Sequence, residues 1–257
     1  MLWSWARSGT PPRSHGFVRE ALPARFSGYI RSSHTPCKPR PGRWRRENSG
    51  RIYGTSTMPL LTIRGMEIHK GMLDRARQEA LVADIVWVVR AAPFFHPETR
   101  WGKRMSVGMT SAGRYGWVSD RRGYRYERRH PEGMAWPPIP ESVLAVWRAA
   151  TGLERDPDCC LVNHYAEGAR MGLHQDRDEA DFSWPVVSVS LGDDGLFRIG
   201  NLERGGRTES VWLSSGDVVV MGGPARLLHH GIDRIRPGSS ALLPEGGRIN
   251  LTLRVVD

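Results

Sequence analysis

The chain has 257 residues, 39% of them hydrophobic, and 37 basic against 27 acidic residues give it a formal net charge of +10. This length supports one sizeable core with a smaller appended region, and no apolar run approaches the roughly 20 residues that span a bilayer, which excludes a membrane-spanning protein. Three cysteines, two of them adjacent, exclude a disulfide framework and predict a cytoplasmic protein in which Cys159 and Cys160 pack within a strand.

Residues 1–57 hold most of the excess positive charge: 11 Arg or Lys and two acids, which leaves 26 basic and 25 acidic residues in 58–257. The segment is rich in Arg, Ser, Pro and Gly and has no helical or strand period, so we expect a disordered basic extension. It fits a targeting segment, a basic arm for nucleic acid, or an upstream extension that is not normally translated, with Met58 as the start. Arginine outnumbers lysine 34 to 3, as is typical of GC-rich genomes with open upstream frames, and we favour the third hypothesis.

Residues 58–155 are predicted to form an N-terminal α/β part. Apolar residues recur near period 3.6 over 72–92, which predicts a helix. The stretch "RMSVGMTSAGRYGWVS", 104–119, indicates a strand and a turn. Prolines followed by an apolar pattern predict a second helix over 141–150.

Residues 156–257 are predicted to be all β. Short strand-like pieces separated by Gly, Asp and Pro follow one another: "CCLVNHYA", "WPVVSVSLG", "GLFRIGN", "ESVWLSSGDVVVMGG", "RLLHHGI" and "RINLTLRVV". Many short strands with turn residues between them are typical of a sandwich or barrel. The expected fold class is therefore α+β, mainly β.

The strand "RINLTLRVV" separates apolar from polar side chains. Because alternate residues share a face, Ile249, Leu251 and Leu253 lie on one side and Arg248, Asn250, Thr252 and Arg254 on the other. For this strand alone, an edge position with a solvated face is the favoured interpretation. If the polar face points into a barrel instead, the buried arginines need an anionic partner, and carboxylates suit Arg well.

A second polar cluster contains candidate metal ligands. His174 and Asp176 share a face if the backbone is extended, and "LLHHGI" offers His229 or His230 from a distant strand. Two histidines and one carboxylate with open positions are typical of non-haem Fe(II) oxygenases. An isolated H-x-D is weak evidence, but together with a strand-borne histidine and the R-x-N-x-T-x-R strand it is much stronger.

The acidic residues that follow Asp176 receive separate interpretations. Asp178 continues the alternation of His174 and Asp176 on an extended backbone. Glu179 and Asp181 are better interpreted as solvated turn residues.

With these residues assembled, the chain resembles the AlkB family of Fe(II)/2-oxoglutarate-dependent dioxygenases, and its bacterial members in particular. The resemblance runs from about Leu60 to Asp257 through "MSVGMTSAGRYGW", "RRGYRY", "WPPIP", "NHYAEGARMGLHQDRDE", "VVSVSLG", "GDVVVMGG", "RLLHHGI" and "RINLTLR". It implies a double-stranded β-helix (jelly roll) core over 156–257 and an N-terminal α/β nucleotide-recognition lid within 58–155.

The resemblance also implies roles for individual residues. The iron ligands would be His174, Asp176 and His230. The 2-oxoglutarate site would contain Arg254, paired with the distal carboxylate, together with Asn163, Tyr165, Arg248 and Asn250.

On the substrate side, the stretch "GWVSDRRGYRYERRH" interleaves aromatic residues with arginines, and an exposed amphipathic hairpin is the simplest interpretation. The resemblance implies that Trp117 stacks on the damaged base and that Tyr124 contacts phosphate, with Arg125 and Tyr126 adjoining. Further implied substrate contacts are Asp178, facing an exocyclic amine, and Arg204. Two departures from the family pattern are Met221, where many relatives have Trp, and Asp120, where a basic or neutral residue is common.

The implied activity is oxidative demethylation of N1-methyladenine and N3-methylcytosine in single-stranded DNA, with RNA as a second substrate, by a monomer that does not bind membranes. 2-Oxoglutarate and O2 would be the cosubstrates, and succinate, CO2 and formaldehyde the products. Three alternatives stay open: a 2-oxoglutarate-dependent hydroxylase of a protein or small molecule, a metal-bound nucleic-acid-binding module without turnover, and a zinc hydrolase.

Overall fold

The structure, a computed structural model, describes residues 59–257. The predicted basic extension, 1–57, lies outside the described residues.

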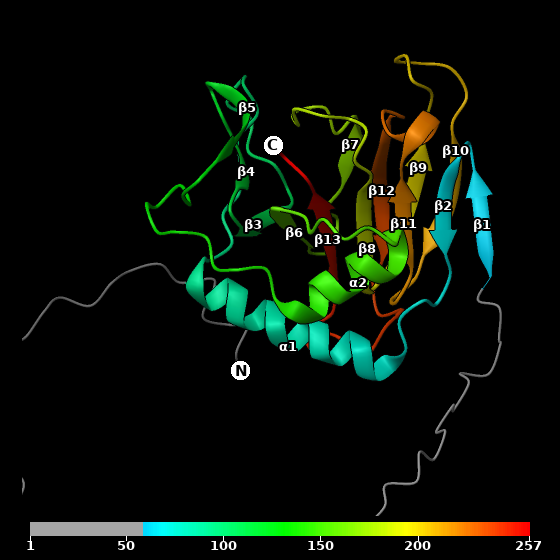
Figure 1. The fold of residues 1–257 in the computed structure, drawn as a ribbon, viewed down its shortest axis with the longest axis horizontal. Coiled ribbons are helices and arrows are strands. Elements are labelled where there is room, and N and C mark those ends of the chain that lie inside the picture. Colours follow the sequence, from blue (N-terminus) through cyan, green and yellow to red (C-terminus); the bar gives the residue numbers. More distant parts are fainter. Residues whose placement is uncertain (1–58) are drawn as a thin grey trace, which may run out of the picture. The chain divides into compact units, whose positions relative to one another are not determined.

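Two antiparallel sheets and a separate two-stranded hairpin contain all the strands of residues 59–257 (Figure 1). The larger sheet contains, in spatial order, β1 (Leu60–Ile63), β2 (Met66–His69), β11 (Val218–Met221), β8 (Val186–Gly192), β13 (Arg248–Arg254), β6 (Cys159–Tyr165) and β3 (Gly108–Gly113). The smaller sheet contains β10 (Glu209–Leu213), β9 (Asp194–Ile199), β12 (His230–Arg236) and β7 (Met171–His174). The hairpin consists of β4 (Gly116–Asp120) and β5 (Gly123–Glu127). These facing sheets confirm the predicted jelly roll.

Helices α1 (Arg75–Ala91) and α2 (Glu141–Thr151) lie on one side of the larger sheet (Figure 1). The predicted helices over 72–92 and 141–150 are confirmed, with small shifts at their ends. α1 begins at Arg75 because the Asp74 side chain accepts a hydrogen bond from the Arg77 backbone N–H at 2.9 Å and so caps the helix.

β13 lies in the interior of the larger sheet, hydrogen-bonded to β6 on one side and β8 on the other. The interpretation of this segment as an edge strand is therefore wrong. Its apolar residues Ile249, Leu251 and Leu253 pack in the same cluster as the buried faces of α1 and α2. The alternating polar residues consequently point into the space between the two sheets.

The hairpin β1–β2 was not predicted from the sequence. Its two-residue turn consists of Arg64 at φ 52° and Gly65 at φ 84°, and positive φ at both positions matches the right-handed twist of the flanking strands. β2 pairs with β11, so strands from 58–155 complete the larger sheet. The division at residue 155 stays a prediction. Within residues 59–257, no helix is long and apolar enough to cross a membrane.

Candidate metal centre and substrate site

The smaller sheet places the two candidate histidine ligands opposite each other. β12 pairs with β7 so that His230 faces His174, and their ring centroids lie 4.7 Å apart. The strands approach closely at Gly231, where a Cβ atom would lie 2.5 Å from the Met171 carbonyl oxygen and 2.7 Å from that of Gly172. Any larger residue after His230 would push β7 and β12 apart, so Gly231 allows the close approach that brings the two histidines together.

Asp176 completes a cluster of three. β7 ends at His174, so Asp176 reaches the histidines from the following coil and not from an extended strand. One carboxylate oxygen lies 3.7 Å from His174 Nε2, the other lies 3.7 Å from His230 Nε2, and ligand atoms of all three residues lie within 4.8 Å of one another.

The second ring nitrogen of each histidine is held by the backbone. Nδ1 of His174 lies 2.9 Å from the Gly172 carbonyl oxygen, and Nδ1 of His230 lies 3.0 Å from that of Leu228. A carbonyl only accepts, so Nδ1 is the donor in each neutral ring and Nε2 keeps its lone pair. Such backbone contacts orient histidine ligands in metal sites.

The charge states also suit a cation. Burial, with a contribution from neighbouring His174, lowers the pKa of His230 to about 4, so this ring is neutral near pH 7. Burial by itself would raise the pKa of Asp176, but the charge of the neighbouring Arg254 guanidinium and its hydrogen bond outweigh burial and hold the pKa below its ordinary value. Asp176 is therefore ionised, and its Oδ2 atom is buried with no hydrogen-bond partner.

Behind Asp176 lies a buried ionic cluster that the sequence did not indicate. Arg254 donates to Asp176 at 2.7 Å and lies 3.3 Å from Glu179, which pairs with Arg226 at 3.0 Å. The side chains of Glu179 and Arg226 are only 1% and 3% exposed. The prediction that Glu179 is a solvated turn residue is wrong, because two arginines from distant segments surround it; Asp181 is exposed as expected.

The residues predicted for 2-oxoglutarate line the same interior. Arg248 is buried, its guanidinium lies 5.3 Å from the centroid of the Tyr165 ring, and it donates to the Ser190 hydroxyl at 2.9 Å. Asn250 bonds Asn163 and the Ser188 hydroxyl.

Several polar atoms of this interior lack partners. Arg248 Nε and Nη1 and Asn163 Oδ1 are buried without a hydrogen bond. Burial lowers the pKa of Arg248, and burial raises the pKa of Tyr165 to about 12. Unpaired buried N–H groups on a guanidinium are costly and fit an anionic ligand.

The β4–β5 hairpin contacts the segment that follows Asp176. Trp117 Nε1 donates to Asp178 at 3.0 Å, and the Trp117 ring stacks on Tyr124 with centroids 5.4 Å apart. The Tyr126 hydroxyl bonds Glu179 and accepts from Arg254 at 3.3 Å. Tyr126 is thus linked to Asp176 through Arg254, whereas Trp117, Tyr124 and Asp178 form a separate group of contacts.

Arg125 is largely neutralised within the hairpin. It donates to Asp120 at 2.9 Å and to Glu127 at 2.6 Å. Hydrogen bonds from Arg125 and Arg122 hold the pKa of Asp120 well below its usual range. The departure at Asp120 therefore gives Arg125 an internal partner.

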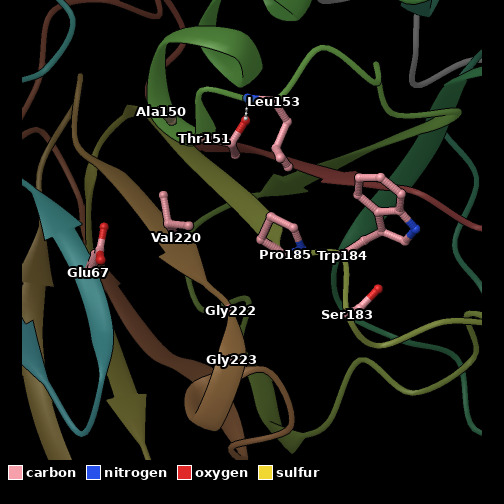
Figure 2. A pocket seen from close by; sticks show the side chains of 10 residues that line it. All are labelled: Glu67, Ala150, Thr151, Leu153, Ser183, Trp184, Pro185, Val220, Gly222 and Gly223. Carbon is pink, nitrogen blue, oxygen red and sulfur yellow. Dashed lines mark hydrogen bonds between the residues drawn. The ribbon is translucent and has the colours of Figure 1, made fainter.

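Arg204 is not brought to the triad. It lines a hollow of about 410 Å³ with Leu173 and His229. Leu173 precedes His174 in β7 and points to the opposite side of the strand. Figure 2 shows another hollow, of about 380 Å³, lined by residues such as Trp184, Pro185 and Val220, and it contains none of the predicted site residues.

Comparisons with known proteins agree with this geometry. Residues 65–254 match the model of the 2OG-Fe(II) oxygenase superfamily. An alpha-ketoglutarate-dependent dioxygenase AlkB homolog from Caulobacter vibrioides is 52% identical over 211 residues, covering 82% of this chain and 96% of the relative. The human nucleic acid dioxygenase ALKBH1 is 30% identical over 134 residues, covering 51% of this chain and 33% of that protein. The solved structure of OsALKBH1 aligns with a TM-score of 0.65 at 33% identity, covering 77% of this chain and 100% of that one.

Proposed function

Because the chain belongs to the 2OG-Fe(II) oxygenase superfamily and, within it, to the AlkB family, we propose that it oxidatively demethylates alkylated bases in nucleic acids. The chain is an Fe(II)- and 2-oxoglutarate-dependent dioxygenase with O2 as cosubstrate. One observation carries the proposal: two histidines and an aspartate converge within 4.8 Å, next to buried arginines with unpaired N–H groups.

We assign the metal to His174 Nε2, His230 Nε2 and Asp176 Oδ2. Bound iron supplies activation of O2, since this ligand set leaves coordination positions open. Arg254 holds Asp176 through Oδ1 only, so the second carboxylate oxygen stays available as a single ligand atom. Glu179, itself held by Arg226 at 3.0 Å, lies 3.3 Å from Arg254 and helps to keep that guanidinium in place.

We assign the 2-oxoglutarate site to Arg248, Arg254, Asn250, Asn163 and Tyr165. The contacts favour a different orientation from the one that the resemblance implies. Arg254 is bound to Asp176 and so lies at the metal end of the site, while Arg248 lies six residues away along β13 with two unpaired donors. We therefore propose that Arg248 binds the distal carboxylate of 2-oxoglutarate and that Arg254 lies beside the end of 2-oxoglutarate nearer the metal.

On the substrate side, we assign the β4–β5 hairpin as the nucleotide-recognition lid. Enzymes that act on a base flip it from the stack and hold it against aromatic rings. Trp117 offers the stacking surface, while Tyr124, Arg125 and Tyr126 line the approach along β5. The Asp178 carboxylate suits the amine of a cationic N1-methyladenine or N3-methylcytosine, and at present the Trp117 indole N–H occupies it. We assign Arg204 only a contact to the nucleic-acid strand away from the flipped base.

The products balance the cosubstrates. One oxygen atom of O2 enters succinate, after loss of CO2 from 2-oxoglutarate, and the other enters the N-methyl group as a hydroxyl. The hydroxymethyl group then leaves as formaldehyde, and the base nitrogen regains its unmethylated form.

The finer proposals concern the form of the substrate and of the protein. A lid that stacks a single base favours unpaired strands, so we propose single-stranded DNA first and RNA second. We further propose a cytoplasmic monomer. Light scattering with and without oligonucleotide measures the assembly state directly.

The test is formaldehyde yield across methylated DNA and RNA oligomers, single- and double-stranded, with and without iron and 2-oxoglutarate. We expect formaldehyde in proportion to succinate, and most from single-stranded DNA with N1-methyladenine or N3-methylcytosine. Succinate without formaldehyde on every oligomer, with hydroxylation of a protein or small molecule instead, would contradict the proposal.

A further inference from the structure

The most exposed large apolar side chain of residues 59–257 lies outside the site described above. Trp101 is 76% exposed, compared with 50% for Trp87 and 47% for Tyr124. An indole left in water forfeits the free energy that its burial would contribute. A single exposed apolar side chain is common by itself, so the backbone that holds Trp101 and the charges around it decide its role.

Trp101 stands at the tip of a closed turn. The Gly102 backbone N–H donates to the Thr99 carbonyl at 2.8 Å, which puts Arg100 and Trp101 at the two corners of the turn. A bridge between Glu98 and Arg104 closes its base. Gly102 has φ +79°, a conformation that glycine adopts without strain. The turn thus presents the indole on a defined backbone.

The turn is fixed to the lid. The Glu98 backbone N–H donates to the Ser119 carbonyl at 3.1 Å, and the Ser119 hydroxyl donates to the Glu98 carbonyl at 2.5 Å. At the tip, the Arg121 guanidinium lies 3.6 Å from the position that a Cβ atom on Gly102 would take. The Trp101 turn is therefore attached to β4, the strand that bears Trp117.

The surroundings of the indole are cationic. The Arg100 guanidinium lies 4.6 Å from the Trp101 ring centroid, and Lys103, Arg104 and Arg121 are exposed nearby. No salt bridge to any of these four basic residues occurs within residues 59–257.

Two acids lie close to these basic groups. Glu98 is exposed at the base of the turn, and Asp120 is already paired with Arg122 and Arg125. The free charge beside Trp101 is consequently positive.

We propose that Trp101 stacks on a base of the substrate strand that flanks the base in the active site, while the basic residues around it contact the adjoining phosphates. Aromatic rings interleaved with cations are the recognition elements of single-stranded nucleic acids. The proposal rests on the proposed nucleic-acid substrate and adds a second, outer stacking position to it.

The experiment compares the full-length wild type with Trp101→Ala, Trp101→Tyr and Trp87→Ala. Trp87 is the matched control, because it is also an exposed tryptophan but lies on α1. Each protein is assayed on a methylated 15-nucleotide strand and on the methylated mononucleotide. The 15-mer also contains the fluorescent base 2-aminopurine beside the lesion.

Stacking on a base is worth about 1–3 kcal/mol, which corresponds to about a 5- to 150-fold change in affinity. Trp101→Ala should therefore raise KM for the 15-mer by that factor, without a change in kcat, and should abolish quenching of 2-aminopurine. Activity on the mononucleotide should stay at the wild-type level, Trp101→Tyr should recover most of the loss, and Trp87→Ala should match the wild type.

Three results would overturn the proposal: an unchanged KM on the 15-mer, an equal loss on the mononucleotide, or a change of oligomeric state with unchanged oligonucleotide affinity. The last result would assign Trp101 to a contact between copies of the chain. Failure of the proposed function is a separate outcome, in which the wild type releases no formaldehyde from any oligomer while the quenching data still report on stacking.

Discussion

Removing Glu179 should destabilise the protein strongly, although this residue is not among the predicted ligands. Its side chain is 1% exposed and pairs at 3.0 Å with Arg226, which is 3% exposed. Breaking a buried pair by deleting one partner costs about 3–5 kcal/mol, because the remaining charge is left buried and uncompensated. For the roughly 200 described residues, each 1 kcal/mol shifts Tm by about 2–4 °C, so Glu179→Ala should lower Tm by about 6–20 °C.

The assay is urea denaturation combined with thermal melting. Arg226→Ala should be similarly destabilised, since it leaves Glu179 with only its contacts to Tyr126 and Arg254. The double variant should lose several kcal/mol less than the sum of the single variants, as expected of groups in direct contact. Glu154→Ala is an exposed control and should stay within about 0.5 kcal/mol of the wild type. A loss below about 1 kcal/mol in Glu179→Ala, or strict additivity, would refute the reasoning.

Three further predictions follow from the same contacts. Arg248→Lys removes the two adjacent N–H donors of the guanidinium, Nε and Nη1, and hydrogen bonds to a charged partner are worth about 1.5–3 kcal/mol. The KM for 2-oxoglutarate should therefore rise about 10- to 150-fold in a succinate assay; an unchanged KM would exclude Arg248 from this site. Asp120→Asn removes one of the two carboxylates that pair with Arg125, so oligonucleotide affinity should increase and its salt dependence should steepen in fluorescence anisotropy titrations; unchanged affinity would show that Arg125 does not contact phosphate. Burial raises the pKa of the Cys159 thiol from 9.0 to about 12. Because the folded-state pKa lies above the unfolded value, the free energy of unfolding should be unaffected by this group below pH 9 and should fall as pH rises from 9 to 12. Urea denaturation at a series of pH values measures this, and a free energy of unfolding that stays constant over that range would contradict the prediction.

The sequence was sufficient to predict the strand faces and the candidate metal ligands, because short-range patterns determine them. Alternation along "RINLTLR" separates a core face from a polar face, and the structure places Leu251 against the helices and Arg254 between the sheets. The H-x-D spacing and a distant H-G pair indicate the three residues that converge, because His174 ends a strand and Gly231 permits close packing. These signals are local and survive without knowledge of the fold.

The sequence was insufficient where a role depends on distant segments. Glu179 is buried because Arg226 and Arg254 come from 47 and 75 positions further along the chain, and no period marks such an encounter. The hairpin β1–β2 was missed because β1 is mostly exposed and lacks alternation, and because its Arg64–Gly65 turn is not one of the common Asn-Gly or Asp-Gly signals. The alternation of Met66 and Ile68 in β2 was the available signal.

The most direct test of the central assignment is Fe(II) binding under anaerobic conditions, followed by formaldehyde yield from the same samples after O2 is admitted. The wild type and a His69→Ala control should bind one iron per chain and release formaldehyde from a methylated oligonucleotide, whereas His174→Ala should lose both. Demethylation that persists in His174→Ala, with iron still bound, would contradict the assignment of His174, Asp176 and His230 as the metal centre.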